Sequence, residues 1–227
     1  MHLKRADLKG FKGFTLAEVL ITLVISGVIA SMTIPTLINK SNNQEYISRL
    51  KKAYSTMAQV TQRIISDEGM PQGSIGGWAT SSEAIFNLYT KYLSNAKVCG
   101  KDITGCFEGT YKKMNGTPGN YDSSNGSNNV YTFVLADGTE VSIQNGHFGS
   151  TCALSGNGSN DVCQFIVVDV NGAKGPNTVG KDAFAFSLKN DGLHPTGCDT
   201  NAGACTNSSI GWGCTCKVLK ENAINYW

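Results

Sequence analysis

The stretch that decides the fold is FTLAEVLITLVISGVIASMTIPTLI, which occupies residues 14–38 and contains a single ionisable side chain, that of Glu18. In a helix that rises about 1.5 Å per residue, a stretch of this length crosses a bilayer core of roughly 30 Å. A secretory signal peptide fits poorly, because its apolar region is shorter, about 7 to 15 residues, and ends at a small-residue cleavage site. We therefore expect one membrane-spanning helix near the N-terminus.

The charges and cysteines around this stretch bear on its orientation. Residues 1–13 carry four basic residues and one acidic residue, so the rest of the chain has a net charge of −1 instead of the +2 of the whole. Residues 39–53 are equally basic, so flanking charge does not settle which end faces the cytoplasm. All eight cysteines lie from Cys99 onward, and therefore on one side of the membrane, as expected if that side oxidises thiols.

Composition excludes several classes of protein. Of the 227 residues, 41% are apolar and 9% aromatic, which is enough to bury a core and too little for a polytopic membrane protein. The net charge of +2 argues against direct binding of nucleic acid, because phosphate binding needs a concentrated excess of Lys and Arg. The low charged fraction of 16%, with many Gly, Asn, Ser and Thr residues, is typical of an extracytoplasmic domain.

The segment KGFTLAEVLITLVISGVIASMTIP, residues 12–35, resembles the N-terminus of type IV pilins and of the pseudopilins of type II secretion. In that family a short basic leader ends in a glycine, here Gly13. A prepilin peptidase cleaves after this glycine on the cytoplasmic side, and the exposed phenylalanine, here Phe14, is N-methylated. The family's glutamate and proline are matched by Glu18 and Pro35.

Glu18 is the unusual residue of the apolar stretch. A carboxylate in a membrane helix costs on the order of 2 to 3 kcal/mol, so a partner is expected for it. The resemblance implies that Glu18 neutralises the new ammonium of Phe14 on a neighbouring subunit. An otherwise costly pair of charges then marks the register of helices that bundle into a filament core. We expect Glu18→Ala to be processed and inserted but to assemble poorly.

The helix is predicted to continue past the apolar stretch. Its apolar residues recur at spacings of three and four, which indicates one amphipathic stripe that packs on the protein's own sheet. That stripe consists of Ile47, Leu50, Tyr54, Met57, Val60 or Thr61, and Ile64. Gly27 and Pro35 are weak points, because Gly costs about 1 kcal/mol and Pro removes a hydrogen bond. In the family the segment between such residues can unwind in the filament.

The whole chain is predicted to have an α+β fold, with the long helix packed on an antiparallel β-sheet domain, as in type IV pilins. We expect a second helix within residues 79–95. Strands are expected at residues 130–135 and 140–143, joined through Asp137-Gly138, and at 164–170 and 183–188. The predicted organisation is a leader (1–13), a transmembrane and assembly helix (14–38), its amphipathic continuation (39–68) and a disulfide-containing, β-rich globular domain (69–227).

The eight cysteines form an even set. Short spacings favour the local pairs Cys99–Cys106 and Cys152–Cys163. The remaining four, which are Cys198, Cys205, Cys214 and Cys216, are expected to pair among themselves. Since a bond between Cys214 and Cys216 would be strained, we expect these two to bond to Cys198 and Cys205, with the connectivity undetermined. Zinc held by the same thiols is the rival interpretation, but the spacing has no C-x-x-C pair and an exported site favours oxidation.

Asp169-Val-Asn171-Gly172, followed by Asn177 and Asp182, brings hard oxygen ligands close together around a Gly-rich turn. Calcium takes six to eight such oxygens, and in the resembling family the major pseudopilins bind it in a β-loop. Residues 169–188 also resemble a segment common in pseudopilin-type β-domains. The alternative is an Asx-rich turn that satisfies its own backbone. No other cofactor is expected.

Catalysis is not expected. The two histidines after the leader, His147 and His194, belong to no recognisable nucleophile, zinc or phosphate motif. An enzyme tethered by this N-terminus would need a polar cleft that the sequence does not reveal.

We therefore predict a structural subunit, a prepilin or pseudopilin, that is cleaved after Gly13 and polymerises through its N-terminal helix. Its expected partners are a prepilin peptidase, an inner-membrane assembly platform and other copies of itself. It is expected in the bacterial inner membrane as a single-pass precursor with the C-terminal domain outside the cytoplasm. It would then enter a periplasmic pseudopilus or a cell-surface pilus. The alternatives are a minor or tip subunit, or a membrane-anchored exported adhesive domain.

Overall fold

The structure is a computed structural model, and it describes residues 13–69, 71, 81–101, 104–107, 109–119, 130–144, 162–198 and 205–226. The chain divides into two compact units, Met1–Asn42 and Asn43–Trp227. The long helix α1 (Leu16–Glu68) begins in the first unit and ends in the second. The other helices are α2 (Ser82–Tyr92) and α3 (Cys214–Glu221).

Within the described residues, six strands form one antiparallel sheet, in the order in which they occur in the chain. They are β1 (Lys97–Gly100), β2 (Val130–Val134), β3 (Glu140–Gln144), β4 (Gln164–Asp169), β5 (Ala183–Lys189) and β6 (Gly192–Pro195). The α+β plan predicted from the sequence is thus confirmed. The hairpin between β2 and β3 turns at Asp137-Gly138, and Gly138 takes a φ of +84° that few other residues tolerate.

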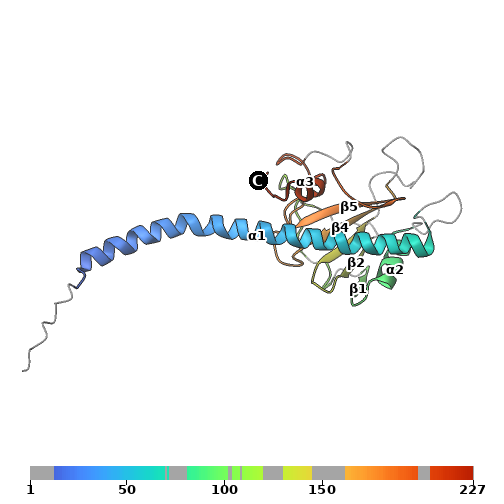
Figure 1. Cartoon of the computed structure of the whole chain (residues 1–227), viewed down its shortest axis with the longest axis horizontal. Helices are drawn as coiled ribbons and strands as arrows, with labels where there is room; N and C mark the ends of the chain where they lie inside the picture. Colours follow the sequence, from blue (N-terminus) through green and yellow to red (C-terminus); the bar gives the residue numbers. More distant parts are fainter. Residues whose placement is uncertain are drawn as a thin grey trace, which may run out of the picture. The chain divides into compact units, whose positions relative to one another are not determined.

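Both faces of the sheet are covered. Because side chains alternate along a strand, β4 and β5 send Ile166, Phe184 and Phe186 to one face and Val167 and Ala185 to the other. The first face packs on α1 and α2, which lie beside the sheet in Figure 1. The second face packs on the loop residues Phe107, Tyr111 and Val179, with Trp212 half-buried against them.

The amphipathic stripe of α1 follows the expected spacing. Leu50, Met57 and Ile64 are fully buried in the first-face core. At the ambiguous position the stripe takes Thr61 and not Val60, and the Thr61 hydroxyl donates to the Met57 carbonyl at 2.7 Å. The same hydroxyl lies 2.5 Å from the Tyr89 hydroxyl on α2. A polar residue is therefore accommodated in the core because its hydrogen bonds are made there.

Three elements were not expected from the sequence. The edge strands β1 and β6 have four residues each, too few to show an alternation pattern, and β6 ends in Pro195, which only an edge strand tolerates. Helix α3 has eight residues and begins at a disulfide-bonded cysteine, so its position is set by cross-links and not by local propensity.

Candidate functional site

The N-terminal end of α1 is highly exposed. Phe14 keeps 87% of its surface accessible, and the apolar side chains that follow, among them Leu23 and Met32, are exposed as well. By length and composition α1 is long and apolar enough to cross a membrane, and none of its most apolar 18-residue window is buried in the structure. Such a surface is stable only where lipid or other helices cover it.

Glu18 is bound to Thr15 at the start of this helix. The Thr15 backbone N–H and hydroxyl both donate to Glu18 Oε2, each at 2.8 Å. In return the Glu18 backbone N–H donates to the Thr15 hydroxyl oxygen at 3.2 Å. This reciprocal arrangement is a capping box, which satisfies backbone donors that the first helical turn cannot pair. Thr15 was not among the residues predicted to have a role, although its T-x-x-E spacing is the signature of that motif.

The two expected weak points lie inside a continuous helix in this structure. Apart from its chain neighbours and the nearby backbone of its own helix, no atom of the described residues lies within 4 Å of where a Cβ of Gly27 would stand. Pro35 has no N–H, so the Ser31 carbonyl lacks its usual helical donor. On either side of Pro35, the hydroxyls of Thr33 and Thr36 donate to carbonyls one turn earlier, at 3.0 and 3.4 Å.

The four proposed calcium ligands lie in and beside the loop between β4 and β5. The carboxylate of Asp182 accepts backbone N–H groups from Asn177 at 2.8 Å and from Thr178 at 2.6 Å. The carboxylate of Asp169 accepts the Asn171 N–H at 3.1 Å. The self-satisfying Asx turn, which the sequence left open as the alternative, is therefore present in the loop.

A third carboxylate joins these two. Glu140 on β3 stands directly opposite Asp169 on β4, and the side chains of both residues are almost fully buried. Burial raises the pKa of Asp169 to about 8, and repulsion from Asp182 adds to the rise. Burial also raises the pKa of Asp182. Tyr111 offsets part of the burial cost by donating its hydroxyl to Asp169 at 2.8 Å. Glu140 could not be assigned to this loop from the sequence, because only the strand register brings it opposite Asp169.

The fit of this loop to a metal ion is mixed. Within the described residues, no group of three or more His, Cys, Asp or Glu side chains is arranged to hold a metal. Two amide oxygens of the proposed set, Asn171 Oδ1 and Asn177 Oδ1, are nevertheless buried and have no hydrogen-bond partner in the part of the chain that the structure describes. Uncharged and charged oxygens of this kind are the donors that calcium takes.

The cysteines of the globular unit form one local pair and two nested pairs. The structure joins Cys99 to Cys106. In the C-terminal set it joins Cys198 to Cys216 and Cys205 to Cys214, so neither bond connects the two cysteines that open α3. Cys163 is disulfide-bonded, and Cys152, its expected partner, lies outside the described residues.

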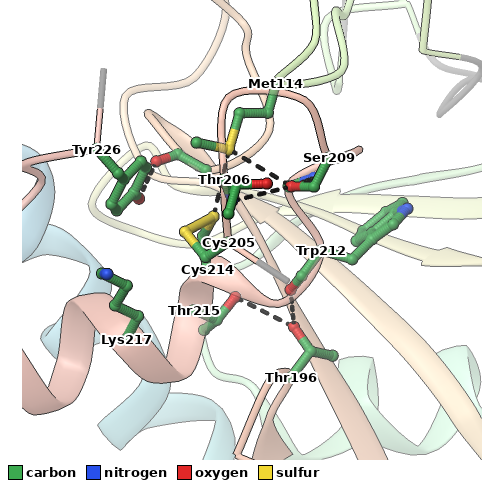
Figure 2. The surroundings of a disulfide bond; sticks show 12 residues. Met114, Thr196, Cys205, Thr206, Ser209, Trp212, Cys214, Thr215, Lys217 and Tyr226 are labelled. Atoms are coloured by element: carbon green, nitrogen blue, oxygen red, sulfur yellow. Dashed lines mark hydrogen bonds between the residues drawn. A yellow bond between two sulfur atoms is a disulfide. The ribbon is translucent and has the colours of Figure 1, made fainter. Parts of the chain in front are cut away.

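The Cys205–Cys214 bond lies within a network that ties the C-terminal segment to the sheet (Figure 2). Met114 Sδ lies 3.5 Å from Cys214 Sγ. Thr196 donates its hydroxyl to the Ala185 carbonyl of β5 at 2.8 Å, and the Thr215 hydroxyl oxygen accepts the Ala185 N–H at 3.0 Å. Tyr226 donates to the Gly180 carbonyl.

The histidines form no catalytic arrangement in the described part of the chain. His194 lies on β6 with its Nε2 at 2.7 Å from the Asp191 carboxylate, in an exposed turn. His147 lies outside the described residues.

Comparison with known proteins bears on the N-terminal segment. Residues 8–34 match the family model described as the prokaryotic N-terminal methylation motif, and this range includes Gly13, Phe14 and Glu18. No curated protein and no solved structure matches the chain.

Proposed function

We propose, from the prepilin signature of type IV pilins and pseudopilins that this chain carries, that it is a subunit cleaved after Gly13 and polymerised through α1. The signature indicates a structural protein and not an enzyme. Together with the exposed apolar helix, it fits a membrane-anchored precursor. The proposal adds cleavage, N-methylation of Phe14 and assembly into a filament.

The observation that carries the proposal is the coincidence of the motif with an uncovered apolar helix that holds one carboxylate. The apolar surface of α1 between Phe14 and Ile38 needs lipid before assembly and other helices after it. Cleavage after Gly13 would create an ammonium at Phe14. On a neighbouring subunit this ammonium offers Glu18 the opposite charge that a carboxylate in an apolar bundle requires.

The globular unit would then form the surface of the filament. Its disulfides and doubly covered sheet suit a domain that works outside the cytoplasm, where thiols oxidise. Both a cell-surface pilus and a periplasmic pseudopilus are compatible with this arrangement. Abundant subunit in filaments sheared from the cell surface would indicate a pilus, and subunit confined to membranes would favour a pseudopilus.

We also propose calcium as a ligand of the loop that contains Asp169, Asn171, Asn177 and Asp182. The support is the pair of buried amide oxygens without partners, beside carboxylates whose burial is costly without a cation. A bound calcium ion would supply positive charge to these oxygens and hold the loop to β4 and β5.

The proposed function is tested by mass spectrometry of the N-terminal peptide, from membranes and from sheared filaments. An N-methylated Phe14 in abundant filaments is expected of a major pilin, and the same end confined to membranes is expected of a pseudopilin or minor subunit. An intact Met1 in cells that contain an active prepilin peptidase would refute processing.

Assembly is tested separately with Glu18→Ala. We expect this variant to be cleaved and inserted normally but to give few filaments. Glu45→Ala is the matched control, because Glu45 lies on the same helix, is exposed and pairs with Arg49 one turn away. Normal filament yield from Glu18→Ala would contradict the proposed role of the carboxylate.

A scarce subunit at the filament tip is the second candidate. The amount of this protein in sheared filaments distinguishes a major subunit from a tip subunit, since a major subunit dominates such filaments and a tip protein does not.

A further inference from the structure

The two disulfides of the C-terminal set are nested. The bond between Cys198 and Cys216 encloses the bond between Cys205 and Cys214. In chain order, however, the first cysteine that follows Cys198 is Cys205. The pairing in the folded domain therefore differs from the pairing that oxidation in chain order would give.

A bond between Cys198 and Cys205 is within reach of the unfolded chain. These two cysteines are separated by as many residues as Cys99 and Cys106, which the structure joins. Because the cost of loop closure grows with loop length, a loop across seven residues closes about fourfold more readily than the native loop across 18. Export from the N-terminal side favours the early bond further, since Cys205 emerges before Cys216.

The early bond leaves two cysteines that do not suit each other. Cys214 and Cys216 lie two residues apart on α3, and side chains at that spacing do not face each other on a helix. They would stay as thiols. A cysteine thiol in an unfolded chain has a pKa of about 8.5, so only about 3% of it is thiolate at pH 7. Because the thiolate is the form that attacks a disulfide, the chain's own thiols remove the early bond slowly.

Correction of the pairing has to precede the packing of α3. The side chains of Cys214 and Cys216 are almost fully buried, with 0% and 2% of their surface accessible. The Cys216 N–H donates to the Thr196 carbonyl at 3.0 Å, and the Thr215 hydroxyl oxygen accepts an N–H of β5 (Figure 2). Once these contacts form, the two sulfurs are closed off from an enzyme.

From these observations we infer that this chain is a substrate of a thiol–disulfide isomerase, a dithiol enzyme kept reduced in the compartment to which the globular unit is exported. The bond that the isomerase removes is Cys198–Cys205. The inference rests on the proposed function for one point, that the globular unit lies where thiols oxidise. It adds a folding partner and the bond on which that partner acts.

The exchange is balanced in electrons and protons. An exported disulfide oxidase takes two electrons and two protons from Cys198 and Cys205 as the early bond forms. The isomerase thiolate attacks Cys205 Sγ, and Cys198 leaves as a thiolate that takes a proton from water. The thiolate of Cys214, whose proton goes to water, then attacks Cys205 Sγ and releases the isomerase thiolate. Finally the oxidase takes two electrons and two protons from Cys198 and Cys216.

The test is a disulfide map of the full chain, exported in bacterial cells with and without the isomerase of that compartment. Free thiols are alkylated at lysis, and the non-reduced peptides are identified by mass spectrometry. Without the isomerase we expect the Cys198–Cys216 bond in about fivefold fewer molecules, because the shorter loop closes first in about four molecules of five. Those molecules should carry the Cys198–Cys205 bond, with Cys214 and Cys216 alkylated. A native map in both strains would overturn the inference.

A double variant assigns the dependence to the competing cysteine. Cys205→Ser with Cys214→Ser leaves Cys198 only Cys216 as a partner within the set, so this bond should form equally in both strains. The matched control is Cys99→Ser with Cys106→Ser, which keeps the competition and should depend on the isomerase as strongly as the wild type. If the first variant depends on the isomerase as much as the control does, the early bond is not its target and the inference is wrong.

The failure of this inference differs from the failure of the proposed function. If the wild type has the native map without the isomerase and still assembles into filaments, only the inference fails. If all eight cysteines are alkylated in wild-type cells, the globular unit is not exported, and the proposed function fails together with the inference.

Discussion

Removing the disulfide between Cys198 and Cys216 by the double change Cys198→Ala and Cys216→Ala should destabilise the globular unit strongly. The bond closes a loop across a sequence separation of 18 residues. For a loop of this length, the entropy that the cross-link removes from the unfolded chain corresponds to about 3 kcal/mol. That is a large part of the roughly 5 to 15 kcal/mol that stabilises an ordinary domain.

Several contacts of the native segment survive the change, so the loss should come mainly from the unfolded chain. The Cys216 N–H still donates to the Thr196 carbonyl, a contact of 3.0 Å. Thr196 still donates to the Ala185 carbonyl at 2.8 Å. The variant should therefore fold to the same structure with a lower free energy of unfolding.

The assay is urea unfolding of the fragment from Asn43 to Trp227, the second compact unit, followed by far-UV circular dichroism. With a slope of about 2 kcal/mol per molar urea, the midpoint should fall by about 1.5 M. Cys99→Ala with Cys106→Ala is the control, because its bond spans only seven residues and should cost less. A loss below about 1 kcal/mol, or a peptide map that joins Cys214 to Cys216, would refute this account.

Three further predictions concern the core, the loop and an ion pair. Leu50→Ala removes a fully buried side chain of α1 and should lower the free energy of unfolding by about 3 kcal/mol, measured by the same urea titration. Calcium should raise the melting temperature of the globular unit and a chelator should lower it, whereas Asp182→Asn should weaken this response; a melting curve unmoved by either reagent would count against the calcium proposal. Burial alone would raise the pKa of Asp137, but hydrogen bonds from Lys52 and Thr139 outweigh it and hold that pKa below its ordinary value. A carboxyl whose folded pKa is lowered stabilises above its unfolded pKa of about 3.9, so Lys52→Met should cost under about 1 kcal/mol at pH 7 and nothing once Asp137 is protonated in both states.

The parts of the fold that were predictable are those with a local pattern. The helical spacing of apolar residues predicted that Leu50, Met57 and Ile64 lie in the core. The Asp137-Gly138 turn predicted the hairpin of β2 and β3. The short strands β1 and β6 and the helix α3 have no such pattern, because pairing to a neighbouring strand or a disulfide fixes them.

The candidate sites divide in the same way. The motif that contains Gly13, Phe14 and Glu18 could be recognised from the sequence, because it is a short linear segment that does not depend on the fold. The Thr15–Glu18 capping box was also present in the sequence, as a spacing of three residues within one helical turn.

By itself, then, the sequence determined the apolar N-terminal helix, its N-terminal methylation motif and the four central strands, because each depends on residues close together in the chain. Only the tertiary structure decided that Glu140 faces Asp169 and that Cys198 bonds Cys216. Those pairs are set by strand register and by the path of the loops, in which distant residues meet. Many pairings suit the same local pattern, and packing of the whole domain selects one of them.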